Sequence, residues 1–274
     1  MESNHSENLS PHSKESALFN LYKLGAIAAA VLSILIGIVL YHYHMNESRY
    51  FINTSATTVS LILLAMNIGF ALTPIFLFKK DISTVADHFP TVKYHFSLPA
   101  ASAIICSVAI IALSPFSTLS TITAVLAIPS SLYTLLMVFD RSKAWTCITG
   151  YLHILFLIAT IALLYMDFNV ELNAPLKLSI QFTAMAAIMS TLSDLRITIG
   201  KESVGLYTFS KIAFLALALF TTTGVILESI PKYESYGIAY VILPLYLLSL
   251  AIPTSIRFFC STLRAKTPTA SDKG

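Results

Sequence analysis

The sequence predicts an all-α fold, a bundle of about eight transmembrane helices, and three observations carry that prediction. First, residues 94–139 form a run of 46 positions without one Asp, Glu, Lys or Arg. A spanning helix needs about 20 apolar residues, so this run holds two spans, separated by the helix-breaking cluster at residues 114–118. Second, 56% of the residues are hydrophobic and 11% are charged, against roughly 25% charged in soluble domains. Third, the positive charges are distributed unevenly between alternate loops.

Eight apolar segments, each bounded by charged or turn-forming residues, define the predicted spans. They cover Leu24–Tyr43, Thr57–Phe78, Leu98–Phe116, Leu119–Phe139, Cys147–Met166, Leu176–Ser193, Tyr207–Leu227 and Tyr236–Ile256. The sixth and seventh have the shortest uncharged cores, so seven spans, with one of these two lying in the interface, is the alternative. The predicted organisation is a disordered cytoplasmic tail at 1–18, an eight-span membrane domain at 19–258, and a cytoplasmic tail at 259–274.

The distribution of Lys and Arg predicts the orientation, because loops rich in these residues are retained on the cytoplasmic side. With the N-terminus inside, the inner segments hold 14 of the 17 Lys and Arg residues. The outer loops then hold only Arg49, Lys177 and Lys232. Both termini are therefore expected in the cytoplasm, which requires an even number of spans.

A short sequence returns at an offset of 124 residues. Residues 126–131 read Leu-Ala-Ile-Pro-Ser-Ser, and residues 250–255 read Leu-Ala-Ile-Pro-Thr-Ser. At the same offset, the sequence of the second span aligns with that of the sixth. One interpretation is a duplication that gives two halves of four spans in the same orientation, a parallel 4+4 repeat. The other is chance similarity between apolar segments, and the third and seventh spans do not keep the offset.

The scarcity of charge inside the spans excludes several classes of function. Charged groups within a bilayer are costly and usually functional, and none lies near the middle of a predicted span. The chain also lacks H-E-x-x-H, the phosphate-binding loop, the dinucleotide fingerprint and the nucleophile elbow. The three cysteines share no metal or disulfide spacing. We therefore expect no enzymatic activity, no cofactor and no metal site.

The expected partners follow from the same composition. No cluster of Lys and Arg is dense enough for nucleic acid. The expected partners are the lipid bilayer and other membrane proteins.

Neutral polar side chains within the spans are the candidate intramembrane contacts. Asn67 in the second span and Gln181 in the sixth could contact a solute or form hydrogen bonds between helices. His153 could change its charge near neutral pH, or stay neutral and bond to a neighbouring helix. Tyr246, in the eighth span, is the fourth candidate. A wide polar cavity lined by Asn67, Gln181 and Tyr246 would favour a transporter.

Two charged residues at the inner ends of adjacent spans form a candidate ion pair. Asp194 lies at the cytoplasmic end of the sixth span, and Lys211 lies near the cytoplasmic start of the seventh span. Both are therefore expected at similar depth in the membrane. Arg196 lies two positions from Asp194 and points to another face of the helix. We therefore predict that Asp194 pairs with a cation from another segment, Lys211 first. The alternative is that each side chain extends separately to the headgroups.

The stretch between residues 165 and 196 carries a resemblance to a known family. It contains Tyr165-Met166-Asp167-Phe168, Leu172-Asn173-Ala174-Pro175-Leu176-Lys177, Gln181 and Leu192-Ser193-Asp194-Leu195-Arg196. This is similar to the "N-x-P-x-K-x-x-x-Q … L-x-E-x-R" run of a group of uncharacterised multi-pass membrane proteins of gut clostridia and related Firmicutes, with Asp194 at the acidic position. The resemblance covers about a third of the chain. It implies a location in the plasma (inner) membrane and implies no activity.

Two classes of function remain open. The first is a structural, accessory or sensory membrane component without catalysis. The second is a transporter or channel for a small neutral or apolar solute, which needs no buried charge. A tightly packed bundle would favour the first class.

Overall fold

The computed structural model describes residues 11–46, 48–78, 83–86, 97–113, 118–139, 143–168, 170–231 and 239–265. Within them the chain is almost entirely helical. The elements are α1 (Pro11–Ile38), the π-helical turn η1 (Val39–Tyr43), α2 (Ser55–Leu77), β1 (Ser83–Ala86), α3 (Ser97–Leu113), α4 (Thr118–Phe139), α5 (Lys143–Met166), α6 (Pro175–Thr198), α7 (Val204–Gly224), the π-helical turn η4 (Val225–Ser229), α9 (Ala239–Cys260) and β2 (Thr262–Ala265). The predicted hairpin cluster at 114–117 and the start of the predicted eighth span lie outside the described residues.

The predicted all-α membrane bundle is confirmed. Seven described helices are long and apolar enough to cross a membrane, and α3 is a shorter apolar helix. The shortest helix is thus α3, whereas the sequence pointed to the sixth or seventh span. The sequence analysis compared uncharged cores, which stop at Asp194 and at Lys211. Helix α6 includes Asp194 and helix α7 includes Lys211, because the two charges lie buried between helices.

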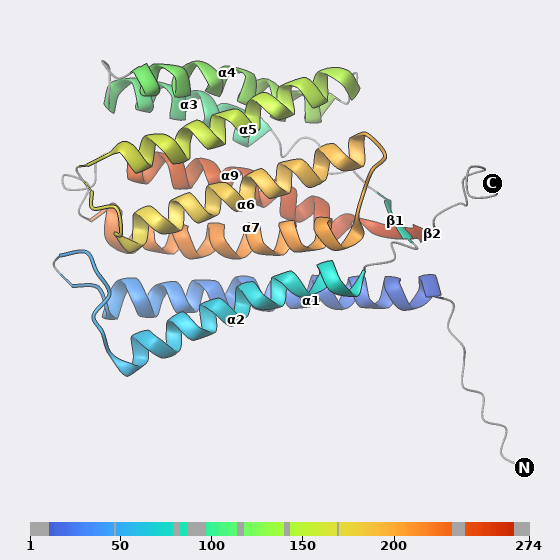
Figure 1. Ribbon diagram of the computed structural model, residues 1–274, viewed down its shortest axis with the longest axis horizontal. Helices are drawn as coiled ribbons and strands as arrows, with labels where there is room; N and C mark the ends of the chain where they lie inside the picture. Colours follow the sequence, from blue (N-terminus) through green and yellow to red (C-terminus); the bar gives the residue numbers. More distant parts are fainter. Residues whose placement is uncertain are drawn as a thin grey trace, which may run out of the picture.

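The bundle has three layers around α7. Figure 1 shows α6, α7 and α9 in a central layer, with α1 and α2 on one side and α3, α4 and α5 on the other. Helix α7 packs on α1, α2, α6 and α9. In the most apolar 18-residue stretch of α7 and η4 together, 67% of the residues are buried, whereas in the corresponding stretch of α2 the share is 22%. Helix α2 is therefore the least covered of the spanning helices.

Local signals set several helix boundaries. The Thr54 hydroxyl accepts a hydrogen bond from the Thr57 backbone at the start of α2, and Ser203 caps α7 in the same way; such caps satisfy backbone donors that have no partner within the helix. Pro175 opens α6, where its missing N–H costs nothing. Gly200, with φ +70°, makes the turn between α6 and α7, because the left-handed region favours glycine.

A short antiparallel pairing closes one end of the bundle. Strand β1 pairs with β2 from Ser83 opposite Ala265 to Ala86 opposite Thr262. Figure 1 shows that α1 begins and α9 ends at this same end. This placement fits an even number of passes; which side of the membrane the end faces stays a prediction.

The predicted tails are shorter in the structure than in the sequence analysis. Residues 11–18, expected to be disordered, already belong to α1. Contacts hold both ends of this segment: His12 Nδ1 lies 2.8 Å from the Ser83 hydroxyl, and directly after the segment the rings of Phe19 and Phe258 meet edge-on at 5.5 Å. Further along α1, Lys23 Nζ donates to the Ser261 carbonyl at 2.5 Å. The second predicted tail likewise begins with the last turn of α9 and strand β2. Residues 1–10 and 266–274 lie outside the described residues.

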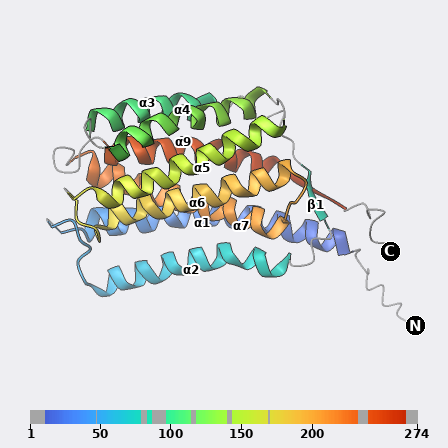
Figure 2. The ribbon, with the colours of Figure 1, turned by 45° about the horizontal axis from the view of Figure 1, so that its top comes forward.

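The arrangement of the helices bears on the proposed duplication. Helices α1 and α2 lie on the opposite side of the central layer from α3 and α4 (Figures 1 and 2). The four helices of the first half therefore do not form one separate body. The 124-residue repeat stays a prediction from the sequence.

Candidate functional site

Three buried charges meet where α6, α7 and α9 come together, near the end that carries β1 and β2. Lys211 Nζ lies 2.8 Å from Asp194 Oδ2, and an Arg257 guanidinium nitrogen lies 3.2 Å from Asp194 Oδ1. Lys211 also donates to the Ser190 hydroxyl at 2.8 Å. The exposed fractions of Asp194, Lys211 and Arg257 are 2%, 2% and 4%. We call these three residues the charge cluster.

The charge cluster contains the ion pair that the sequence suggests. Asp194 and Lys211 contact each other, and neither extends to the surface, so separate extension of both side chains to the headgroups is not what the structure shows. Removing one partner of such a pair leaves an uncompensated buried charge. The cluster therefore holds α6, α7 and α9 in one relative position.

Arg257 is the member that sequence reasoning missed. It was assigned to the cytoplasmic flank because it follows the apolar segment of the eighth span. The spacing of Arg257 from other residues of α9 could have indicated that it is buried. Arg257 lies three residues after Thr254 and seven after Leu250, and all three are buried on one face of α9. Residues at these spacings share a helix face.

A second polar group lies deeper in the bundle, between α4, α5 and α9. His153 Nδ1 is 2.7 Å from the Ser130 hydroxyl and 3.3 Å from the Tyr246 hydroxyl, and the two hydroxyls are 3.2 Å apart. Tyr133 stacks on the imidazole with ring centroids 5.2 Å apart. His153 Nε2 has no hydrogen-bond partner among the described residues.

This histidine group bonds helices together. Ser130 and His153 both have an exposed fraction of 0%. A serine beside a histidine is also the pairing used in nucleophilic catalysis, but here both side chains are fully buried and contact each other between α4 and α5. The sequence singled out His153 and Tyr246 separately; their contact through Ser130 depends on the packing of three helices.

The other two candidates lie elsewhere. Asn67 donates from its side-chain nitrogen to the Ala29 carbonyl at 3.0 Å and to the Ser33 hydroxyl at 2.9 Å, which joins α2 to α1. Gln181 is half-buried on α6. Asn67, Gln181 and Tyr246 therefore do not line a common polar cavity in the described part of the chain.

An apolar groove runs between α2 and α6 and has α7 as its floor. Its volume is about 510 Å³. Its walls include Leu61, Leu64 and Ile68 of α2 and Leu178 and Phe182 of α6, with Phe220 of α7 at the base. We call it the lateral groove. None of the predicted candidate residues lines it.

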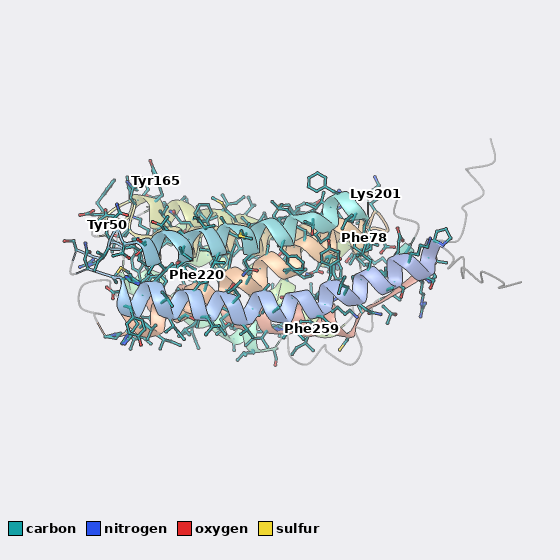
Figure 3. The ribbon with its side chains drawn as sticks, turned by 90° about the horizontal axis from the view of Figure 1, so that it is seen from below. Tyr50, Phe78, Tyr165, Lys201, Phe220 and Phe259 are labelled. Carbon is teal, nitrogen blue, oxygen red and sulfur yellow. The ribbon has the colours of Figure 1, made fainter. Side chains whose placement is uncertain are left out.

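The lateral groove lies at the end of the bundle opposite β1 and β2. Figure 3 shows Phe220 toward the end that carries Tyr50 and Tyr165, and Phe78 and Lys201 toward the other end. At the Tyr50 end, the Tyr50 hydroxyl donates to the Glu171 carboxylate. That hydrogen bond raises the pKa of the Tyr50 phenol above its ordinary value.

These features define the class of the protein: a multi-spanning helical membrane protein whose interior charges and polar groups bond across helices. No protein family, curated protein or solved structure matches the chain. Among the described residues, no group of three His, Cys, Asp or Glu side chains could hold a metal ion.

Proposed function

We propose that this chain is a component of the plasma (inner) membrane that performs no catalysis and has a structural, accessory or sensory role. One observation carries the proposal. The charged and polar side chains inside the bundle pair with one another across helices, as in the contacts of Asp194 with Lys211 and of His153 with Ser130. Ionisable groups that serve transport usually face a substrate pathway or a water-filled cavity.

The orientation we propose has both termini in the cytoplasm. The uneven distribution of Lys and Arg supports it, and so does the placement of the start of α1 and the end of α9 at one end of the bundle. The charge cluster then lies near the cytoplasmic side, and the lateral groove lies in the outer half of the membrane.

An accessory role needs a surface for another membrane protein, and α2 offers the most exposed one. Met66 and Phe76 are 65% and 74% exposed, and α2 is the least covered of the seven described helices that are apolar enough to span the membrane. We propose that this outer face of α2 contacts the partner.

Site-specific photocrosslinking in cells tests the proposal. A photoreactive residue replaces Met66 in one variant and the buried Leu157, which has an exposed fraction of 0%, in the control. The expected result is one discrete adduct with another protein at Met66 and none at Leu157. An absence of adducts at Met66 would contradict the partner surface.

A second candidate function is favoured by the lateral groove: transport of a small neutral or apolar solute. The protein reconstituted into liposomes separates the two candidates. If the first proposal holds, the efflux of trapped neutral solutes equals that of empty liposomes. Efflux faster than that of empty liposomes would favour the transporter instead.

A further inference from the structure

The lateral groove extends from one end of the bundle to about the middle of the bilayer. Pro175 is the first residue of α6 and lies at one end of the groove, and Phe182 lies seven residues further along. At 1.5 Å per residue this is about 10 Å. On α2, Ile68 is 13 residues from the start of the helix, which is about 20 Å. One leaflet of a hydrocarbon core about 30 Å thick is about 15 Å, so the groove extends from the bundle end to near the midplane.

The groove opens sideways toward lipid. Leu61 and Phe182 belong to its lining and are 44% and 54% exposed. Both lie on helices that cross the membrane, so their exposed sides face hydrocarbon. Phe51 and Phe220 also belong to the lining, and both rings pack against Tyr41, with centroids 5.3 Å and 5.4 Å from it.

The lining of the lateral groove offers few polar groups to a ligand. The Ser179 hydroxyl is engaged: it donates to the Leu176 carbonyl at 2.8 Å and accepts from the Tyr41 hydroxyl at 3.4 Å. Asn173 is the other polar residue of the lining, and it is exposed in the loop before α6. The polar part of an occupant therefore belongs at the loop end of the groove and its apolar part between the helices.

The volume of the groove is that of a site for a small ligand. It measures about 510 Å³, which lies within the range of about 300–1,000 Å³ found for such sites. The apolar lining and the opening toward lipid favour a hydrocarbon chain as the occupant.

We propose that the lateral groove holds one acyl chain of a phospholipid from the leaflet that borders the α1–α2 and α5–α6 loops. The terminal part of the chain lies between Ile68 and Phe182, and the ester region lies beside Asn173. The site selects for the apolar chain and makes no charged contact with the headgroup. This inference does not depend on the accessory role proposed above, since a protein that binds a lipid in this way can serve either function.

The test uses phosphatidylcholine that carries a photoreactive diazirine in the middle of one acyl chain, in vesicles with the full-length protein. After irradiation, mass spectrometry maps the adducts. The expected result is labelling of the α2 and α6 segments that line the groove, severalfold above that of the exposed Ile128 on α4, which is 60% exposed. Equal labelling of all lipid-facing segments would show only the annular lipid shell and would overturn the proposal.

Groove-filling variants make the test specific. Leu64→Trp places a bulky side chain in the groove and should lower the labelling severalfold. Ile62→Trp is the matched control, because Ile62 is 53% exposed on the same helix and is not part of the lining. Ile68→Trp fills the other end of the groove and serves as the second variant if the first does not elute as a folded protein. Unchanged labelling in a folded groove-filling variant would overturn the proposal.

A third arm identifies the source of the chain. A free fatty acid with the same diazirine is offered in place of the phospholipid. The phospholipid should label the groove at least as well as the fatty acid at equal membrane content. Labelling by the fatty acid alone would reject a phospholipid as the occupant.

Discussion

Replacement of Lys211 by Met should have opposite consequences in two backgrounds. In the native chain Lys211 contacts Asp194, which also contacts Arg257. The buried charge cluster then carries two cations and one anion. Lys211→Met leaves the cluster with one cation and one anion, whereas Asp194→Asn removes the acid that contacts both cations.

The magnitudes follow from burial and from this charge count. Breaking a buried pair by removal of one partner costs about 3–5 kcal/mol. We place Asp194→Asn near 5 kcal/mol, since both cations lose their contact with this carboxylate, and Lys211→Met near 3 kcal/mol, since Arg257 remains 3.2 Å from Asp194. In the Asp194→Asn background, Lys211→Met removes a cation whose contact with the carboxylate is already lost, so the free energy of unfolding should stay unchanged or rise. The coupling energy is then about 3 kcal/mol, the upper end for residues in contact.

The assay is reversible unfolding in mixed lipid–detergent micelles for the four proteins of this double-mutant cycle. Lys201→Met is the matched control, because Lys201 is exposed at the same end of the bundle and surface substitutions usually change stability by about 0.5 kcal/mol or less. Equal losses from Lys211→Met in both backgrounds would mean that the two charges do not interact, and the reasoning from the charge cluster would be refuted.

Three further predictions concern helix contacts and topology. Asn67→Leu removes both hydrogen bonds from α2 to α1 and should lower the free energy of unfolding by about 0.6–2 kcal/mol; an unchanged value would mean that these bonds add no stability. Gly205→Ala should destabilise by about 1–3 kcal/mol, because the new Cβ would lie 2.6 Å from a backbone oxygen of α2. Gly69→Ala is its control: a Cβ there meets nothing within 4 Å, so stability should hold or rise, and equal losses in both variants would rule out the close approach. A reporter after Gly274 should be cytoplasmic and one within Met45–Ser55 external; a cytoplasmic signal from the second would contradict the orientation.

The helices could be predicted from the sequence because the bilayer imposes a length and a composition on every span. Their boundaries were less accurate. Counting apolar residues ends a span at the first charge, but the backbone stays helical wherever that charge finds a buried partner. The uncharged core of the seventh predicted span starts directly after Lys211, but Lys211 lies well inside α7 for this reason.

Parts of the candidate site could be predicted and others could not. Asp194 and Lys211 could be paired because two adjacent helices place them at similar depth. The third member, Arg257, comes from a helix distant in sequence, and its pairing with Asp194 follows only from the packing of α9 on α6. The lateral groove arises from the separation of α2 and α6 above α7, and no local pattern in either helix encodes that separation.

The pairing of β1 with β2 sets an order for biosynthesis. Thr84 and Arg264, which are partners in this pairing, are separated by 180 residues. At about 5–20 residues per second, β1 waits roughly 9–36 s after its synthesis before β2 emerges. Helices α3 to α9 are inserted during that interval, while the edge of β1 has no strand beside it. Completion of the bundle end therefore waits for β2, and a protein that stopped after Ser261 would contain the described helices α1 to α9 but leave β1 without β2.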